Sequence, residues 1–415
     1  MELFDLSDKT ERVILVGVQE NDGDDTEESL QELAELAKTA GAEVVGTVIQ
    51  KRERIHPGTY VGKGKIDEIR TLLNALDATG IICDDELSPV QMNHLQQELE
   101  SKIMDRTLLI LDIFASRAVT KEGKIQVELA QLRYRAVRLV GLGSSLSRLG
   151  GGIGTRGPGE KKLEMDRRLI KERISQLKKE LEHVKKHREL LREGRKKDRV
   201  MTAAIVGYTN AGKSTLLNTL TDAGVLSEDK LFATLDPTTR LLELDGGQRI
   251  YLTDTVGFIR KLPHHLIEAF KSTLEEAKYA DVILHVVDAS NPQVEEQMFI
   301  VYETLRELGV KDKTIVTLFN KQDRLAGNEI LRDFKADYVL KISARTGLGL
   351  DELKNTLEKI LIGNQIYIER VLDYKDAGML QLVRKYGQLI EEKYTENGIE
   401  IKARVPKDIY GRFGE

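Results

Sequence analysis

Short apolar runs alternate with amphipathic segments over the first 115 residues of the chain. This alternation is typical of a small α/β domain with mostly parallel strands, which we place at residues 1–120. The apolar runs predict strands at Val13–Val18, Val44–Ile49, Ile81–Cys83 and Leu108–Ile113. The segments between them predict helices at Glu27–Ala40, Lys65–Leu76 and Pro89–Ser101.

A heptad pattern follows and predicts a two-helix coiled-coil arm at residues 121–198. Apolar residues recur every seven positions in the second helix, with a second series four positions later. The glycine-rich tip, 141–160, should be mobile when unbound because it has little apolar surface to bury. We call the apolar contact line between the two helices the seam. On the second helix it is predicted to consist of Leu163, Ile170, Ile174, Leu177, Leu181, Val184 and Leu191. On the upstream helix it is predicted to consist of Leu129, Leu132, Ala136 and Leu139.

The strongest motif lies between an apolar strand at Met201–Val206 and a helix predicted from Thr215. It matches G-x-x-x-x-G-K-[ST], a loop whose amides and following helix N-terminus hold phosphates. Lys213 would reach the β and γ oxygens, and the Ser214 hydroxyl would ligate Mg²⁺. The predicted phosphate-binding residues are Gly207, Tyr208, Thr209, Asn210, Ala211, Gly212, Lys213 and Ser214.

Three further motifs follow predicted strands in the order typical of a Ras-like GTPase domain, which we place at 199–363. The D-x-x-G motif would hold magnesium through Asp254, with Gly257 sensing the γ-phosphate. In N-K-x-D, the Asp323 carboxylate can accept two hydrogen bonds from guanine that adenine cannot donate, so GTP is the expected substrate. The motifs comprise Asp254, Thr255, Val256 and Gly257; Asn320, Lys321, Gln322 and Asp323; and Ser343 and Ala344.

The segment between the phosphate loop and D-x-x-G is predicted to contain a switch threonine that ligates Mg²⁺. Spacing alone leaves Thr234, Thr238 and Thr239 open. The position after Gly257, where Ras carries a water-orienting glutamine, is Phe258, which can neither hydrogen-bond nor transfer a proton. We therefore expect slow intrinsic hydrolysis that a partner stimulates.

Charge is segregated along the chain although the total is only −5. Residues 1–100 carry −13, residues 101–200 carry +13 and residues 201–415 carry −5. The cationic quarter coincides with the predicted arm, which favours a polyanionic partner over the alternative of a merely solvated helix. No run of 18 apolar residues predicts a membrane span, and a single cysteine, Cys83, excludes an intramolecular disulfide.

These motifs resemble one family, the HflX GTPases. The resemblance covers about 10–363 and rests on G-Y-T-N-A-G-K-S, F-A-T-L-D-P-T-T, D-T-V-G-F, N-K-Q-D and S-A-R, together with V-G-K-G-K at 61–65 and the glycine-rich signature at 150–160. One departure is Lys161-Lys162 where the family commonly has Thr-Gln. The resemblance assigns contact with the nucleotide to a switch segment and to a base pocket. The switch residues are Phe232, Ala233, Thr234, Leu235 and Asp236, and the base-pocket residues are Ser343, Ala344 and Arg345.

The resemblance implies a cytoplasmic enzyme that binds the large ribosomal subunit and splits stalled or idle ribosomes, hydrolysing GTP to GDP. We expect this enzyme to be a monomer. It assigns Mg²⁺ to Ser214, Thr234 and Asp254, and catalysis to Lys213, Thr234 and Gly257. It also implies that the tip of the arm reaches ribosomal RNA, with Arg148 and Arg156 inside it. Any membrane association would be peripheral, through ribosomes.

Beyond residue 363 the resemblance weakens, and residues 364–415 are predicted to form a small β-α-β domain. Strands are expected at Gln365–Leu372 and Ile399–Val405, around a helix at about 375–387. Three alternatives to ribosome splitting remain open from the sequence. They are a GTPase in ribosome assembly or RNA modification, a second ATP-dependent activity at the loop His56–Lys65, and an arm that serves as an oligomerisation coil.

Overall fold

In the computed structural model of the chain, the described residues are 10–20, 25–146, 158–198, 200–221, 231–232, 234–244, 248–263, 274–325, 327, 331–363, 365–406 and 410–411. The chain divides into two compact units. The first comprises residues 1–185 with 228–236 and 259–272, and the second comprises 186–227, 237–258 and 273–415. None of the described helices is long and apolar enough to cross a membrane.

The first unit contains the N-terminal α/β domain. Its described sheet is parallel, in the order β2-β1-β3-β4, and is built from β1 (Arg12–Gln19), β2 (Glu43–Lys51), β3 (Gly80–Cys83) and β4 (Lys102–Asp105). The first three predicted strands and all three predicted helices are confirmed. The helices are α1 (Thr26–Thr39), α2 (Lys63–Ala75), α3 (Pro89–Leu99) and α4 (Arg106–Arg117).

The predicted strand at Leu108–Ile113 is wrong, because these residues lie in helix α4. The strand of this region is the shorter β4, and the chain turns directly into α4 after it. Asp105 caps the helix, since its carboxylate accepts a hydrogen bond from the Leu108 amide at 2.8 Å. Leu109, Leu111 and Phe114 are all buried, so the helix is apolar on more than one side and its sequence resembles a buried strand.

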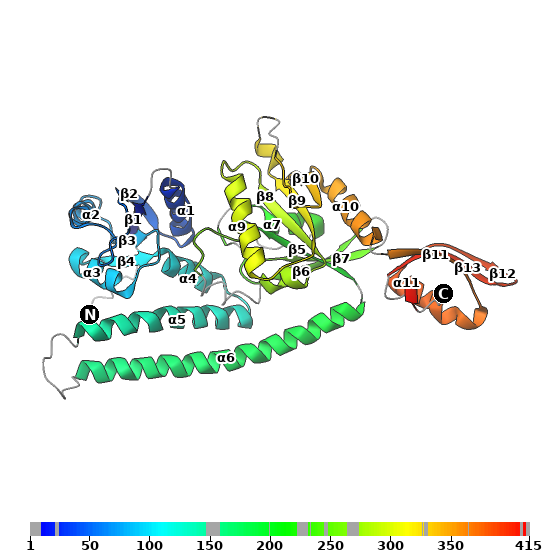
Figure 1. Cartoon of the computed structure of the whole chain (residues 1–415), viewed down its shortest axis with the longest axis horizontal. Coiled ribbons are helices and arrows are strands. Elements are labelled where there is room, and N and C mark those ends of the chain that lie inside the picture. Colours follow the sequence, from blue (N-terminus) through cyan, green and yellow to red (C-terminus); the bar gives the residue numbers. More distant parts are fainter. Residues whose placement is uncertain are drawn as a thin grey trace, which may run out of the picture. The chain divides into compact units, whose positions relative to one another are not determined.

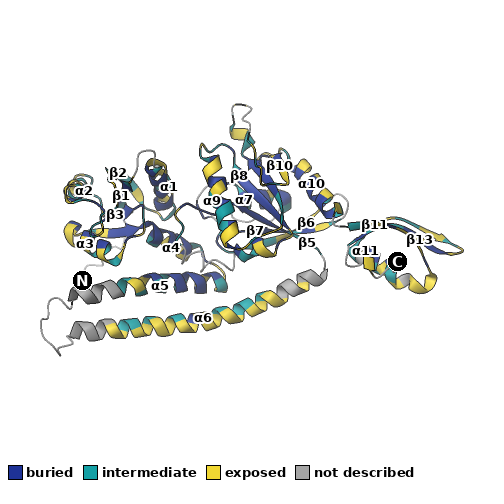
Figure 2. Ribbon diagram, in the orientation of Figure 1, coloured by how far each residue is buried: buried dark blue, intermediate teal, exposed yellow. Residues whose placement is uncertain are grey.

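The arm consists of α5 (Lys121–Leu146) and α6 (Pro158–Asp198), and Figure 1 shows α5 alongside the first part of α6. Two of the residues predicted for the seam on the α5 side, Leu129 and Leu132, pack with four predicted on α6, together with Ile125. The other residues of α6 whose burial is described are mostly exposed (Figure 2). Helix α5 continues through residues 141–146, which were predicted to belong to the tip. Residues 147–157 lie outside the described residues, and they include Arg148, Arg156 and most of the glycine-rich signature. The packed α6 residues are Ile174, Leu177, Leu181 and Val184.

The second unit contains the doubly wound sheet of the GTPase domain, whose described strands run in the order β10-β9-β8-β5-β7-β6. All neighbours pair in parallel except the edge strand β6. The buried strands are dark in Figure 2, and their apolar side chains form one core with α7 and α10. The elements are β5 (Met201–Gly207), α7 (Lys213–Thr221), β6 (Thr238–Glu243), β7 (Arg249–Asp254), β8 (Val282–Asp288), α9 (Val294–Glu307), β9 (Thr314–Asn320), a 3₁₀ turn at Gln322–Arg324, β10 (Tyr338–Lys341) and α10 (Leu350–Gly363).

The C-terminal segment is an α+β fold, but its predicted β-α-β order is incomplete. Helix α11 (Ala377–Tyr386) follows β11 (Gln365–Leu372) and a 3₁₀ turn, and two strands come after it, β12 (Gln388–Thr395) and β13 (Gly398–Pro406). The described sheet is antiparallel, in the order β11-β13-β12. The missed strand, β12, is rich in charged residues and lies at an edge. The Asn397-Gly398 turn that joins it to β13 is a hairpin signal that was available in the sequence.

Candidate nucleotide-binding site

The phosphate loop connects the end of β5 to the start of α7, as its motif predicts. Two of its glycines leave no space for a side chain. A Cβ on Gly207 would lie 2.2 Å from the Val286 carbonyl oxygen, and one on Gly212, where φ is +97°, would lie 2.3 Å from Asn320 Nδ2. Asn210 also has a positive φ, of 59°. The loop therefore holds a tight conformation that ordinary residues rarely adopt.

Lys213 is buried at the start of α7, with 6 % of its surface exposed. Its Nζ donates a hydrogen bond to the Tyr208 carbonyl oxygen at 2.7 Å. Burial lowers the pKa of Lys213 to about 8 against the opposing effect of Asp254. A neutral carbonyl compensates a buried ammonium poorly, so the site is electrostatically prepared for an anion such as phosphate.

Two of the three predicted magnesium ligands lie together. The Ser214 hydroxyl donates to Asp254 Oδ2 at 2.7 Å, and Asp254 is fully buried at the end of β7. A hydroxyl and a carboxylate are hard oxygen donors of the kind that Mg²⁺ prefers, so this pair fits the ion. The third residue, Thr234, lies in the 231–236 segment of the first unit. Among the described residues, no group of three or more His, Cys, Asp and Glu forms a separate metal site.

The D-x-x-G segment packs directly against the phosphate loop. A Cβ on Gly257 would lie 2.8 Å from Thr209 Cγ2 and 2.9 Å from Lys213 Nζ. The Phe258 amide donates to the Gly207 carbonyl at 3.1 Å, and the Phe258 carbonyl accepts from the Thr209 amide at 2.8 Å. The Phe258 ring is 1 % exposed, so it fills the core and cannot orient an attacking water. Thr255 and Val256 are also buried.

The base-pocket motifs are joined through Asn320. Its Nδ2 donates to the Ala211 carbonyl and its Oδ1 accepts from the Ala344 amide, both at 2.8 Å, which ties the phosphate loop to the Ser343–Arg345 segment. Ser343 Oγ donates to Asp323 Oδ1 at 2.6 Å, and this bond lowers the pKa of Asp323. Asp323 is exposed and ionised, as a guanine acceptor must be.

The two remaining residues of N-K-x-D have different partners. Lys321 has a positive φ, of 63°, and pairs with Asp288 at 2.7 Å. Gln322 Nε2 donates to the Phe319 carbonyl at 3.1 Å. Arg345 is exposed. The structure therefore brings the predicted residues of the phosphate loop, D-x-x-G and the base pocket together within the second unit.

The predicted switch residues lie in the first unit. Phe232 and Leu235 are buried there, while Ala233 lies outside the described residues. Asp236, which was predicted to contact nucleotide, directs its carboxylate to the N-terminus of α5, where it accepts from the amides of Val119 and Thr120 at 3.0 and 2.9 Å.

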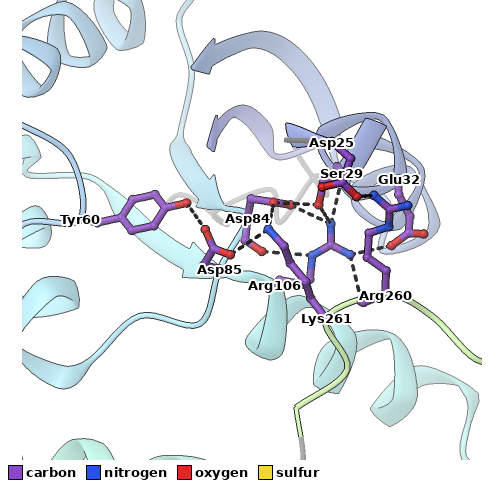
Figure 3. A network of polar contacts seen from close by, with 9 residues as sticks. All are labelled: Asp25, Ser29, Glu32, Tyr60, Asp84, Asp85, Arg106, Arg260 and Lys261. Atoms are coloured by element: carbon purple, nitrogen blue, oxygen red, sulfur yellow. Dashed lines mark hydrogen bonds and ion pairs between the residues drawn. The ribbon is translucent and has the colours of Figure 1, made fainter. Parts of the chain in front are cut away.

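A polar cluster of the first unit was not predictable from the sequence (Figure 3). Asp84, which follows β3, and Arg106, at the start of α4, are each 1 % exposed and pair at 2.7 Å. Lys261, four residues after Gly257, donates to Asp84 at 2.5 Å and to Asp85 at 2.8 Å. The acidic residues directly after the buried strand Ile81–Cys83 were the available signal, but nothing in the sequence identified their partners.

Three family models match successive parts of the chain. The model described as "GTP-binding GTPase N-terminal" matches residues 27–115, "GTP-binding GTPase Middle Region" matches 117–195, and "50S ribosome-binding GTPase" matches 202–321. Together they span the N-terminal domain, the arm and most of the nucleotide site. The loop and D-x-x-G motifs described above fall within the third match.

Two relatives match this chain over nearly its whole length. The chain is 67 % identical over 414 residues to a GTPase HflX of Lacrimispora saccharolytica, covering 100 % of this chain and 98 % of the relative. It is 50 % identical to a GTPase HflX of Caldanaerobacter subterraneus subsp. tengcongensis, covering 99 % and 94 %. A solved structure of a GTP-binding protein from Sulfolobus solfataricus in complex with GDP is 27 % identical, with a TM-score of 0.45, covering 84 % of this chain and 98 % of that one.

Proposed function

Because the chain belongs to the HflX family of GTPases, we propose that it binds the large ribosomal subunit and splits stalled or idle ribosomes. GTP favours the bound form, and hydrolysis to GDP permits release. The observation that carries this proposal is the joined nucleotide site, in which Asn320 connects the phosphate loop to the base pocket, on a chain that also carries a basic two-helix arm. The proposed location is the cytoplasm, where ribosomes are.

The chemistry proposed for the site is positioning and charge stabilisation. Lys213 holds the β and γ oxygens, the Gly257 amide senses the γ-phosphate, and Asp323 selects guanine. Ser214, Asp254 and Thr234 are the residues proposed to hold Mg²⁺, which neutralises phosphate charge when bound. Because Lys213 and Asp254 are buried, their interactions with phosphate and Mg²⁺ would act away from bulk water.

We expect the purified protein alone to hydrolyse GTP at a rate on the order of 10⁻⁴ s⁻¹, as unaided Ras does. The Phe258 ring is buried and offers no group that orders water. Single-turnover hydrolysis with and without large subunits measures this rate and its stimulation. A rate of several per second without ribosomes would contradict the prediction.

The same preparation tests ribosome splitting. Intact ribosomes are incubated with the protein and a non-hydrolysable GTP analogue, and free subunits are then quantified by sedimentation. The proposal expects free subunits to increase with the GTP analogue and not with GDP. Stimulated hydrolysis without any increase in free subunits would instead favour the assembly or RNA-modification alternative.

We propose that the arm provides the contact with ribosomal RNA and that the protein acts as a monomer. The faces of α6 away from the seam carry exposed lysines, including Lys178 and Lys179. Such side chains bind phosphates with a strong dependence on salt, of about one unit of log–log slope for each contact. A solvated arm without a partner would give no such slope.

Deleting residues 144–158 should leave GTP affinity unchanged and abolish the stimulation of hydrolysis by large subunits. The physical reason is that the deletion removes the tip proposed to contact RNA, while the nucleotide site lies after residue 200. The matched variant Lys178→Glu/Lys179→Glu keeps the tip and should instead weaken subunit binding and lower its salt slope. Normal ribosome splitting by the deletion variant would refute the role of the tip.

A further inference from the structure

Segment 231–236, which contains the switch threonine Thr234, is attached to the first unit on both sides of that residue. Before it, the Phe232 ring is 2 % exposed and packs edge-to-face on Phe114 of α4, with ring centroids 4.7 Å apart. Phe232 also has a positive φ, of 55°, which an L-residue adopts only when its surroundings hold it there. After it, Asp236 is hydrogen-bonded at the N-terminus of α5. Thr234 is thus held between an aromatic anchor and a helix cap.

Asp236 contacts the two residues that directly precede α5 and so supports the N-terminus of this helix from a distant part of the chain. The carboxylate accepts from the amides of Val119 and Thr120 and from the Thr120 hydroxyl. Thr120 Oγ in turn accepts from the Gly123 amide at 3.0 Å. The Gly123 amide belongs to the first turn of α5 and has no partner inside the helix, so the Thr120 hydroxyl caps it. A negative charge at this end, such as the Asp236 carboxylate, is further stabilised by the helix dipole. Thr120 is therefore the N-cap residue of the first helix of the arm, and Asp236 holds Thr120 in place.

Gly123 makes this cap possible. A Cβ at this position would lie 2.4 Å from Asp236 Oδ1, so only glycine leaves space for the carboxylate. Glycine inside a helix otherwise weakens it relative to alanine. The position of this glycine is thus unfavourable for the helix alone and favourable for its contact with segment 231–236.

Segment 259–261, directly after D-x-x-G, is attached to the same unit (Figure 3). Lys261, at a positive φ of 55°, bridges Asp84 and Asp85, and Arg260 pairs with Asp25. The Arg106 guanidinium, which is paired with Asp84 and Glu32, also donates to the Arg260 carbonyl at 3.4 Å. The charges of Arg106 and Lys261 outweigh the effect of burial and lower the pKa of Asp84, so Asp84 faces Lys261 as a carboxylate.

From these contacts we infer that the capped first turn of α5, through Asp236, Thr120 and Gly123, is the positioning element that couples the switch threonine to the arm. The Lys261–Asp84 pair is a second attachment, of the segment after Gly257. This inference rests on the proposed function, because it names the route by which a large subunit bound at the arm stimulates hydrolysis. Coupling of this kind is reciprocal, so nucleotide must also alter the first turn of α5.

The first test is Gly123→Ala, which removes the space for the Asp236 carboxylate while improving helix propensity. We expect its basal GTP hydrolysis to stay within about twofold of wild type and the stimulation by large subunits to fall at least about tenfold, equivalent to about 1.4 kcal/mol of coupling. The control is Gly194→Ala on α6, where a Cβ would meet nothing within 4 Å. This control should be stimulated like wild type.

A pair of variants at Thr120 separates positioning from a general loss of structure. Thr120→Val keeps the shape but loses the hydroxyl that donates to Asp236, and Thr120→Ser restores it. We expect Thr120→Val to lose the stimulation by large subunits and Thr120→Ser to retain it. Both variants should bind GDP with the same affinity as wild type, which shows that the nucleotide site is intact. Lys261→Ala should reduce stimulation through the second attachment.

Hydrogen exchange of residues 119–123, compared between GDP and a non-hydrolysable GTP analogue, tests the inference without ribosomes. Exchange should depend on the nucleotide in wild type and Gly194→Ala, and should be independent of it in Gly123→Ala. Unstimulated wild-type protein would contradict the proposed function, whereas stimulated wild type with equally stimulated Gly123→Ala and Thr120→Val would overturn the inference alone.

Discussion

The Asp323→Asn variant is expected to bind GTP at least about 100-fold more weakly than wild type and to bind xanthosine triphosphate in its place. Asp323 would accept two hydrogen bonds from guanine, and each bond to a charged acceptor is worth about 1.5–3 kcal/mol. The asparagine amide presents donors where the carboxylate presented acceptors. These donors oppose the guanine amino group and match the carbonyl oxygen that xanthine carries at that position.

The surroundings of Asp323 should survive the substitution, so the change in specificity can be read cleanly. Ser343 Oγ, which donates to Asp323 at 2.6 Å, can donate equally to the Asn carbonyl oxygen. The bonds of Asn320 that join the phosphate loop to the base pocket do not involve Asp323.

Isothermal titration with both triphosphates measures the effect. Asp351→Asn, at an exposed position of α10, is the matched control and should bind like wild type. Equal affinities of the Asp323 variant for GTP and xanthosine triphosphate, with GTP unchanged, would show that the base lies elsewhere.

Much of the nucleotide site was predictable because its chemistry is local in sequence. The loop 207–214 needs a strand before it and a helix after it. Both elements can be predicted from the spacing of apolar residues in the sequence. The same local reasoning failed at Leu108–Ile113, where a buried helix is apolar on more than one side and reads as a strand. It also missed β12, an edge strand whose charged residues obscure the alternation.

The attachments of the switch segments were not predictable from the sequence, because they join residues more than 100 positions apart. Asp236 lies 116 residues from Thr120, and Lys261 lies 177 residues from Asp84. In the sequence, Asp236 belongs to a motif and is naturally assigned to the nucleotide. In the sequence, Gly123 is a single glycine within a helical pattern. Only the structure shows why glycine is needed there, because the Asp236 carboxylate occupies the space of a Cβ.

The Lys213→Met variant should lose GTP hydrolysis by about 100-fold or more and yet be more stable than wild type without nucleotide. Folding buries the ammonium of Lys213 and lowers its pKa from 10.5 to about 8. Between these two values the unfolded chain binds more protons than the folded chain, so the stability of the wild type rises with pH across this window. Below pH 8 the full cost of the buried charge, of order 3 kcal/mol, is present, and methionine removes it.

The same pKa governs nucleotide affinity in the opposite sense. Phosphate requires the protonated lysine, so the affinity of the wild type for GTP should be constant below pH 8. It should fall by up to about tenfold for each pH unit above it, until the pKa of the complex is reached. Thermal unfolding of the nucleotide-free protein measures the effect on stability, and titration with GTP measures the effect on affinity. Both measurements are made at pH 7 and at pH 9.5.

Lys186→Met, at an exposed position of the arm, serves as the control and should show neither the gain in stability nor the change in turnover. A Lys213→Met protein that is less stable than wild type at pH 7 would show that the bond from Lys213 to the Tyr208 carbonyl outweighs the cost of burying the charge. In that case Lys213 would stabilise the nucleotide-free protein, and the binding of phosphate would not be favoured by relief of an uncompensated buried charge.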